Sequence, residues 1–503
     1  MGFRLTLFLF LASLPVILTQ EITHAEILVD GTQKVAETDD SFICATLDWW
    51  PHDKCNYNQC PWGYTSVTNL DLSRPLLAKA IKAFKPLRIR VGGSLQDQVL
   101  YDVGSNTGAI LTFGLNALHG RHKSGKNAWA GDWDVSNAHA FINYTISKGY
   151  HIDSWEFGNE LSGSGIGASV GAEQYAKDLK KLKNIINKLY IGSYFKPPLV
   201  APGGFFDQEW FAKLLQVSGS DVVNVVTHHI YNLGPGNDPN LVSKILNPQH
   251  LSKVSRTFIN LEETIQQNGP WASVWIGESG GAFNSGGHNV SNTFVNSFWY
   301  LDQLGMSSNY STKVYCRQTL VGGNYGLLDK TTFTPNPDYY SALLWHRLIG
   351  KGVLSVGTNA SPFLRTYAHC SKGREGLTLL LINLSNQTGF IINIENSMNL
   401  NKRAEANSIR RENSFFSSLK KTVSWIGSKA SDVSLREEYH LTPKDGYLQS
   451  RTMVLNGIPL ELTSDGEIPE LDPVLNEVKS PLYIAPLSIA FIVLPNFDAP
   501  ACV

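Results

Sequence analysis

The sequence has no excess of charge of either sign. Its 42 Lys and Arg residues nearly balance 43 Asp and Glu residues, giving a formal net charge of −1. Without a basic excess, no long-range field draws the whole chain to nucleic acid or to an anionic membrane. Nucleic acid is therefore excluded as a general partner, and any acidic ligand must be bound by a local group of residues.

Cysteine is also scarce, with six residues in a chain of 503. Six are too few for a disulfide scaffold, although an oxidising compartment would allow a few staples. Cys370 and Cys502 lie near the two ends of the C-terminal region and are the preferred pair. Cys55 and Cys60 are interpreted as a loop disulfide, because a C-x4-C spacing near the single histidine His52 is a poor zinc signature.

The N-terminus carries Arg4 and then an apolar run from Leu5 to Leu18, which is the pattern of a secretory signal peptide. We assign the signal to residues 1–25 and expect a secreted protein of the extracellular space or cell wall, or one delivered to the lysosome or vacuole. A later apolar stretch, Leu482–Leu494, contains proline and predicts a strand rather than a membrane span. Six glycosylation triplets are compatible with this route: Asn143, Asn289, Asn309, Asn359, Asn383 and Asn386.

Between about residue 74 and residue 350, short β-branched runs alternate with amphipathic segments, as in a parallel α/β fold. Eight strands are predicted: 46–49, 87–92, 110–116, 152–160, 198–203, 222–231, 273–278 and 313–320. Eight strands with intervening helices favour a (β/α)8 TIM barrel, whose active site lies at the carboxyl ends of the strands. The barrel is assigned to residues 46–350.

Helices are predicted after nearly every strand, at 74–83, 136–148, 172–189, 208–217, 254–267, 290–304 and 337–348. No helix is predicted between Gly92 and Ile110, where the glycine-rich segment Gly104–Gly108 has little helical character. A parallel crossover usually needs a dozen or more residues, most often as a helix. The barrel is therefore predicted to be short of its second helix.

After Gly350 the pattern changes to strand-like runs separated by polar loops: 376–383, 390–394, 452–456 and 483–494. This predicts a C-terminal β-sandwich over residues 351–503, packed beside the barrel. A leading strand within residues 26–45 is expected to join it. The loop 399–421, with Lys402-Arg403 and Arg410-Arg411, is interpreted as a solvated insertion in preference to a polyanion site.

Two predicted strands end in glutamate. Strand alternation places Glu156 and Glu160 on one face of the fourth strand, with Glu160 at the barrel mouth. Glu278 ends the seventh strand and is followed by glycines that allow a substrate to approach. Retaining glycoside hydrolysis needs such a pair about 5 Å apart, one carboxyl to protonate the leaving oxygen and one to attack the anomeric carbon. The alternative is that either glutamate is only a buried, hydrogen-bonded residue of the barrel core.

Several short sequence motifs, in their order and spacing, resemble those of the heparanase-like family of glycoside hydrolases, and the sequence looks most like its plant members. The motifs are Leu87–Ser94, Thr112–Ala117, Trp155–Glu160, His228–Tyr231, Trp275–Glu278, Arg317-Gln318 and Asn324-Tyr325. The resemblance implies that Glu160 is the proton donor, that Glu278 is the nucleophile, and that Asn159 donates a hydrogen bond to the sugar 2-hydroxyl.

The same resemblance implies further roles around the sugar. Tyr231 is expected to orient Glu278, and His229 to support the site. Four residues are expected to line the sugar pocket: Asp48, Ser94, Gln318 and Tyr325. The turn Asn284-Ser285-Gly286 matches the family's turn whose backbone N–H groups recognise the carboxylate of glucuronic acid.

A basic and aromatic loop follows the third strand, on the catalytic face of the predicted barrel. Its residues Arg121, Lys123 and Trp129 are predicted to bind acidic or branched sugar outside the cleaved unit, through charge and ring stacking. One feature departs from the family. Members usually carry a longer segment between the fragments around Asp97 and Thr112, and it includes the second barrel helix.

The sequence therefore favours a retaining β-glucuronidase that cleaves glucuronic acid linkages in proteoglycans or arabinogalactans. The alternatives are a retaining β-glycosidase for a neutral sugar, and a catalytically silent glycan-binding protein if the missing helix prevents assembly. No metal or cofactor is predicted, because the glycine-rich string Gly163–Gly167 does not open a phosphate-binding helix. We expect a monomer that binds an acidic polysaccharide, and peripheral association with a membrane stays open.

Overall fold

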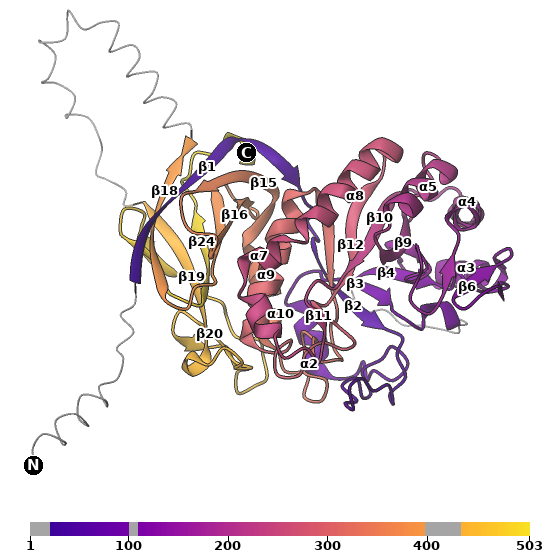
Figure 1. Cartoon of the computed structure of the whole chain (residues 1–503), viewed down its shortest axis with the longest axis horizontal. Coiled ribbons are helices and arrows are strands. Elements are labelled where there is room, and N and C mark those ends of the chain that lie inside the picture. The colour runs from indigo at the N-terminus through magenta and orange to yellow at the C-terminus, as the bar shows by residue number, and fades with distance from the viewer. Residues whose placement is uncertain (1–20, 100–108, 398–433) are drawn as a thin grey trace, which may run out of the picture.

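The computed structural model describes residues 21–99, 109–397 and 434–503 (Figure 1). The predicted basic loop 399–421 and the first twenty residues of the predicted signal peptide lie outside these ranges. An α/β part and a sheet-rich part lie side by side, with helices α9 and α10 between them (Figure 1). Within the described ranges, no helix combines the length and apolar character needed to cross a bilayer.

Eight parallel strands close into a barrel in chain order, which confirms the predicted TIM-barrel fold. The strands have no exposed polar face, because core side chains fill the barrel and helices cover most of its outside. The strands are β2 (Ile43–Asp48), β3 (Arg88–Gly92), β4 (Ile110–Leu115), β7 (Ser154–Phe157), β9 (Leu199–Phe205), β10 (Val225–Ile230), β12 (Ser273–Ser279) and β14 (Thr312–Arg317).

The helices lie close to their predicted positions. They are α2 (Pro75–Lys82), α3 (Ser136–Ser147), α4 (Ala172–Leu189), α5 (Gln208–Ser218), α8 (Ser255–Asn268), α9 (Phe294–Asn309) and α10 (Pro337–Leu348), with two short helices, α6 (Leu241–Ile245) and α7 (Pro248–Ser252), that were not predicted. Asp207 caps α5 by accepting a hydrogen bond from the Trp210 N–H. Helices α9 and α10 are buried on nearly every side because they separate the two parts.

The connection between β3 and β4 is short. Among its described residues the only helical element is the 3-10 turn η1 (Gln96–Gln98). Residues 100–108, in the region where the second barrel helix is predicted to be missing, lie outside the described ranges. Leu111 and Phe113 of β4 are only partly buried, whereas every residue of β10 is buried. The outer face of β4 is therefore less well covered than that of β10.

The sheet-rich part is one 11-stranded sheet. It consists of β1 (Glu21–Glu37), β15 (Ile349–Thr358), β16 (Leu364–Ser371), β17 (Leu377–Asn383), β18 (Thr388–Asn396), β19 (Leu435–Pro443), β20 (Met453–Leu455), β21 (Ile458–Pro459), β22 (Val474–Glu477), β23 (Leu482–Ile484) and β24 (Ser488–Leu494). The sheet curls so that β1, β18 and β23 pack over β17 and β24 in one apolar cluster. Alternate residues of β17 and β24, such as Leu380 and Phe491, pack toward the barrel helices instead.

The structure describes most of the predicted leading segment. Strand β1 begins at Glu21 and pairs in parallel with β18, and its Ala25 is buried. The signal peptide and its boundary stay predictions. The first barrel strand begins at Ile43, ahead of the predicted residue 46. Strand β1 joins the second part through β15 and β18.

Three disulfides are present. Cys370–Cys502 is the pair predicted from sequence position, and Cys55–Cys60 is the predicted loop staple. The third, between Cys44 of β2 and Cys316 of β14, was not predicted. It links the first and last strands of the barrel across a parallel pair.

One of the predicted glycosylation positions is wrong. Asn383 is fully buried, its Nδ2 donates to the carbonyls of Thr388 and Ala485, and its Oδ1 accepts from the Ser385 N–H. An amide used in this way cannot carry a glycan in the folded chain. The other five asparagines are exposed: Asn143, Asn289, Asn309, Asn359 and Asn386.

Candidate active site

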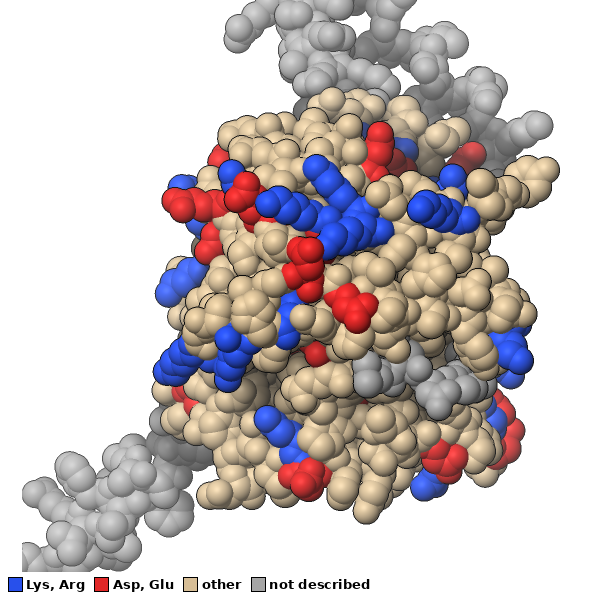
Figure 2. Space-filling model, turned by 90° about the vertical axis from the view of Figure 1, so that its right-hand side faces the viewer, with Lys and Arg blue, Asp and Glu red and all other residues tan. Residues whose placement is uncertain are grey.

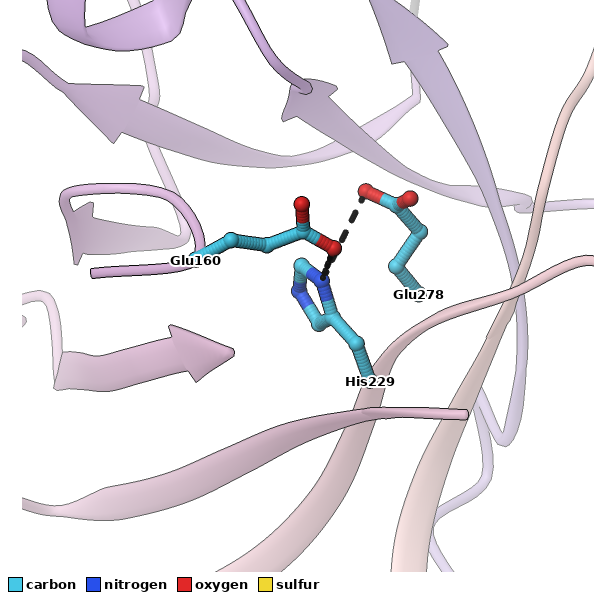
Figure 3. A group of neighbouring side chains, drawn as sticks. All are labelled: Glu160, His229 and Glu278. Carbon is cyan, nitrogen blue, oxygen red and sulfur yellow. Dashed lines mark hydrogen bonds and ion pairs between the residues drawn. The ribbon is translucent and has the colours of Figure 1, made fainter. Parts of the chain in front are cut away.

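Three side chains from separate barrel strands converge at the carboxyl ends of those strands. Glu160 follows β7, His229 belongs to β10 and Glu278 belongs to β12, and their polar ends point toward one another (Figure 3). His229 Nδ1 lies 3.0 Å from Glu160 Oε1 and 3.8 Å from Glu278 Oε2. A carboxylate oxygen of each glutamate and the histidine nitrogen all lie within 4.8 Å of one another.

Glu160 reaches the site through a turn rather than by strand alternation. Strand β7 ends at Phe157, and the chain then takes left-handed conformations at Gly158 (φ +71°) and Glu160 (φ +55°). The backbone N–H of Glu160 donates to the Gly203 carbonyl at 2.7 Å. The predicted position of Glu160 at the mouth is therefore right, but the predicted reason is wrong.

Glu160 is poised as a neutral acid. Only 8% of the residue is exposed. Burial raises the pKa of its carboxyl to about 7, and the nearby Arg90 opposes this rise. Burial also lowers the pKa of His229 to about 3, so its ring is neutral at ordinary pH. A neutral imidazole can accept a hydrogen bond from protonated Glu160 or donate one to its carboxylate, and it therefore suits both protonation states.

Glu278 has a different environment, with a strong donor on each oxygen. The Tyr231 hydroxyl donates to Oε1, and Arg90 Nη1 donates to Oε2 at 2.9 Å. Arg90 also donates through Nε to Glu156 at 2.6 Å and through Nη2 to the Asn159 side-chain oxygen at 2.8 Å. One buried guanidinium therefore aligns the second glutamate and the amide beside the first.

Sequence reasoning missed Arg90, although a signal was available. Arg88 and Arg90 share one face of β3, and a buried strand seldom carries two cations on one face. Glu156, predicted to lie one layer below Glu160, is fully buried and is the partner of Arg90. Two cations on one face of a buried strand therefore predict an acidic partner inside the barrel, but they do not identify it.

Asn159 is held at both ends. Its side-chain oxygen is occupied by Arg90, so the side-chain NH2 group is left to donate. Its backbone N–H donates to Asp97 at 2.8 Å, and Asp97 also accepts from the Ala117 N–H at 2.6 Å. Burial raises the pKa of Asp97 to about 7, against the effect of these two hydrogen bonds. Asp97 was not predicted as a site residue.

Three of the four predicted pocket residues form a network beside Glu278. Gln318 Nε2 donates to Asp48 at 2.6 Å and lies 3.4 Å from the Tyr325 hydroxyl. Burial raises the pKa of Asp48 to about 7, and the charge of Glu278 adds to this effect. Ser94, the fourth predicted residue, is exposed in the turn after β3 and is not part of this network.

The predicted carboxylate-binding turn follows the short strand β13 (Ala282–Phe283). Asn284, Ser285 and Gly286 all have left-handed φ angles, of +56°, +73° and +77°. Glycine is required at the third position, because a Cβ on Gly286 would lie 2.8 Å from the Tyr325 ring. The turn therefore lies directly against a residue of the Asp48 network.

The predicted role of Arg121 is wrong. Its guanidinium is fully buried, pairs with the buried Asp178 at 2.7 Å, and donates to the carbonyls of Ala117 and Gly131. A side chain used in this way cannot reach a substrate. It instead anchors the hairpin of β5 (His122–Lys123) and β6 (Ala128–Ala130).

The rest of this hairpin lies next to the segment that follows Glu160. Strand β6 pairs with β8 (Ser169–Val170), and the Val170 N–H donates to the Leu161 carbonyl. Lys123 is exposed, whereas Trp129 is half-buried against the barrel cluster. Exposed positive charge therefore remains on this hairpin without Arg121.

The ligand atoms of Glu160, His229 and Glu278 lie close enough together to hold a metal ion. However, Glu278 already bonds to the Arg90 guanidinium, and a divalent cation there would be repelled by this fixed charge. Two carboxylates with oxygens under 5 Å apart match the spacing of retaining glycosidases, because inverting enzymes hold theirs roughly 6.5–9.5 Å apart.

Comparison with known proteins gave consistent matches. The family described as "Glycosyl hydrolase family 79, N-terminal domain" matches residues 24–107 and 105–305, in two pieces that meet where the second helix is predicted to be missing. Heparanase-like protein 1 of Arabidopsis thaliana is 61% identical over 545 aligned positions, covering all of both chains, whereas this chain has 503 residues. This length difference agrees with a missing internal segment.

A second relative and a solved structure extend these matches. Baicalin-beta-D-glucuronidase of Scutellaria baicalensis is 39% identical, over 92% of this chain and 90% of the relative. A 4-O-alpha-L-rhamnosyl-beta-D-glucuronidase from Fusarium oxysporum superposes with a TM-score of 0.61 at 14% identity, covering 93% of this chain and all of that one. The structural match supports the fold.

Proposed function

The chain belongs to glycosyl hydrolase family 79 and is a glycoside hydrolase, and we propose that it is a retaining β-glucuronidase that acts on acidic glycans. The observation that carries the proposal is the unequal environment of two glutamates whose oxygens lie within 4.8 Å. Glu160 is buried without a direct cationic hydrogen bond, which favours its acid form. Glu278 instead receives hydrogen bonds from Arg90 and Tyr231, which hold its two oxygens in place for attack.

The proposed reaction proceeds by double displacement. Glu160 donates its proton to the glycosidic oxygen while Glu278 Oε attacks the anomeric carbon, and the aglycone leaves as an alcohol. Glu160, now a carboxylate, takes a proton from water. That water attacks the anomeric carbon, releases Glu278 and gives the sugar with retained configuration. Asn159 donates to the 2-hydroxyl, where the hydrogen bond strengthens in the transition state.

The preference for glucuronic acid is supported by the turn Asn284–Gly286, which lies on Tyr325 beside the Asp48 network. Its left-handed backbone allows successive amide groups to face one anion, as in other backbone anion sites. The name of the Scutellaria relative is that of a β-D-glucuronidase, and its similarity covers most of both chains. Both observations favour a uronic acid over a neutral sugar.

The aglycone side is proposed to contact the hairpin after β4. His122, Lys123 and Lys126 are exposed there, next to the segment that follows the acid/base. Figure 2 shows the face that carries α3, α4 and β6, on which Lys and Arg side chains gather with fewer acidic ones between them. The double change Lys123→Ala/Lys126→Ala is expected to raise KM for an acidic oligosaccharide but not for a nitrophenyl glucuronide. An unchanged KM for both would contradict this role.

We also propose that the chain works outside the cytosol, as a monomer, on polysaccharide or proteoglycan glycans of the extracellular space, cell wall or an acidic compartment. Three disulfides, Cys44–Cys316, Cys55–Cys60 and Cys370–Cys502, support an oxidising compartment. Five exposed glycosylation triplets agree with it. Peptide mapping of glycans on the protein isolated from its own tissue tests the route, and unmodified asparagines with free thiols would contradict it.

Hydrolysis of 4-nitrophenyl β-D-glucuronide tests the activity. Glu278→Gln should abolish turnover, and proton NMR of the first product should show the β anomer. The α anomer would contradict the retaining mechanism. A panel of neutral xylosides, glucosides and arabinofuranosides provides the control. If the protein hydrolyses any of these faster than the glucuronide, that sugar and not glucuronic acid is its substrate.

A further inference from the structure

The long loop after β2 is closed on itself near its middle. Cys55 and Cys60 form a disulfide, and between them Asn56 and Gln59 exchange backbone hydrogen bonds of 2.8 and 3.0 Å. The two residues between these partners, Tyr57 and Asn58, have φ angles of +53° and +58°. Two successive left-handed residues are the signature of a type I′ hairpin turn. Residues 55–60, hereafter the disulfide hairpin, therefore form a small stapled unit.

The disulfide hairpin and its flank hold Ser285, the middle residue of the turn after the nucleophile. Asn56 Nδ2 donates to the Ser285 hydroxyl at 2.7 Å, and Trp62 Nε1 donates to the same oxygen at 2.8 Å. Next to it, Asn284 Nδ2 donates to the Tyr57 hydroxyl at 3.0 Å. A hydroxyl that accepts two hydrogen bonds has its orientation fixed.

The turn needs such support. Asn284 and Ser285 are not glycines, yet both are left-handed, a conformation that is unfavourable for residues with a Cβ and persists where the surroundings enforce it. Ser285 is only 2% exposed. From the opposite side, the Asn324 N–H donates to the Ser285 carbonyl at 2.6 Å. The hairpin and Asn324 thus hold the turn between them.

The same elements lead to the reacting centre. The Trp62 ring packs edge-on against Tyr325 at 6.1 Å, and Tyr325 lies beneath Gly286. The Tyr325 hydroxyl meets Gln318, which donates to Asp48 in the sugar pocket. A shift of Ser285 would therefore move the amide groups of the turn relative to a sugar bound at Glu278.

We propose that Asn56 and Trp62 are positioning residues that set the preference for a β-glucuronide over the corresponding neutral β-glucoside. They do so by fixing Ser285, so that the amides of residues 284–286 face the carboxylate of the sugar. This inference rests on the proposed glucuronidase function. It assigns specificity to the loop after β2, the first barrel strand. In the barrel, β2 lies on one side of the nucleophile's strand β12, and β7, which carries the acid/base, lies on the other side.

The test compares kcat/KM for 4-nitrophenyl β-D-glucuronide and 4-nitrophenyl β-D-glucoside. Trp62→Phe removes the indole N–H donor and keeps an aromatic ring, and Asn56→Ser removes the amide donor. Each change is expected to lower the glucuronide-to-glucoside ratio about fivefold, and the pair more than tenfold. The loss should lie in KM for the glucuronide, with kcat nearly unchanged, because the carboxylate is bound equally in ground and transition states.

Two further variants separate positioning from general damage. Gln59→Ala removes an exposed amide from the same hairpin, and it should leave the ratio unchanged. Cys55→Ser/Cys60→Ser opens the hairpin without altering either donor, and it should lower the ratio in the same direction. Thermal melting shows whether each variant is folded.

The failures of the two proposals are distinguishable. If the wild-type chain prefers the glucuronide but the Trp62 and Asn56 variants lose activity equally on both substrates, or on neither, the positioning proposal is overturned and the proposed function stands. If the wild-type chain prefers the glucoside, both are overturned. A rise in KM for the glucuronide alone supports the positioning role, provided that it becomes smaller when either Trp62 or Asn56 is put back into the double variant.

Discussion

Arg90 offers the sharpest test of how the barrel assigns roles to its two glutamates. It lies 2.9 Å from the proposed nucleophile Glu278 and 2.6 Å from the buried Glu156. Replacing Arg90 alone would leave Glu156 as an uncompensated buried charge, which typically costs about 3–5 kcal/mol of folding free energy. The informative variant is therefore Arg90→Met/Glu156→Gln, which removes both charges of that buried pair together.

The expected effect follows from the hydrogen bond that Arg90 donates to Glu278. A hydrogen bond to a charged group typically contributes about 1.5–3 kcal/mol. Each 1.4 kcal/mol of activation free energy is about a factor of ten in rate, so losing the alignment of the nucleophile should lower kcat/KM about ten- to a hundredfold.

The assay is kcat/KM for 4-nitrophenyl β-D-glucuronide at one fixed pH. Glu156→Gln is the matched control, because it keeps the hydrogen bond from Arg90 to Glu278. Its kcat/KM should stay near that of the parent chain. If the double variant and this control have the same kcat/KM, Arg90 does not align the nucleophile, and the reasoning is refuted.

Three further predictions follow from the geometry of the barrel. Because burial raises the pKa of Glu160 to about 7, its acid form and the activity should be lost as pH rises through that value. A loss of activity with rising pH that is already complete below pH 5 would contradict this assignment. Glu160→Gln should spare only substrates with activated leaving groups. Arg121→Ala breaks the buried pair with Asp178 and should cost about 3–5 kcal/mol of stability with KM unchanged, whereas Lys123→Ala should leave the melting temperature unchanged. Inserting the relatives' segment near residues 105–107 should raise the free energy of unfolding by several kcal/mol, because it would bury a few hundred Å² of apolar surface at about 25 cal/mol per Å². Equal melting temperatures of the chain with and without the segment would refute this prediction.

The barrel could be predicted because its strands are covered on both faces. Two-sided burial produces apolar runs such as that of β9, which is followed by α5 with its capping residue Asp207. The pairing of β1 with β18 could not be predicted, because it joins segments more than 300 residues apart whose sequences specify no partner.

The site was predictable where its residues stand at strand ends. Glu278 and Glu160 follow from strand position and turn glycines. Arg121 misled because a basic loop sequence does not reveal that Asp178, on α4, lies where it can bury the guanidinium. Arg90 was missed because its meaning depends on partners from β7 and β12. Local patterns locate the reacting groups, whereas the charges that tune them come from distant strands.

Strand β3 has the catalytic centre on its inner face, and the predicted loss of the second helix affects the outer face of the barrel beside it. Arg90 extends from β3 into the barrel, where it bonds to Glu156, Asn159 and Glu278. The connection after β3 keeps Asp97, which accepts from the Asn159 N–H, at its start. What the shortening affects is the outer face, where Phe113 of β4 is only partly buried. Loss of an outer helix removes apolar cover but none of these hydrogen bonds. The chain should therefore lose thermal stability before it loses catalytic geometry, and its turnover per folded molecule at low temperature should match that of a version with the segment restored.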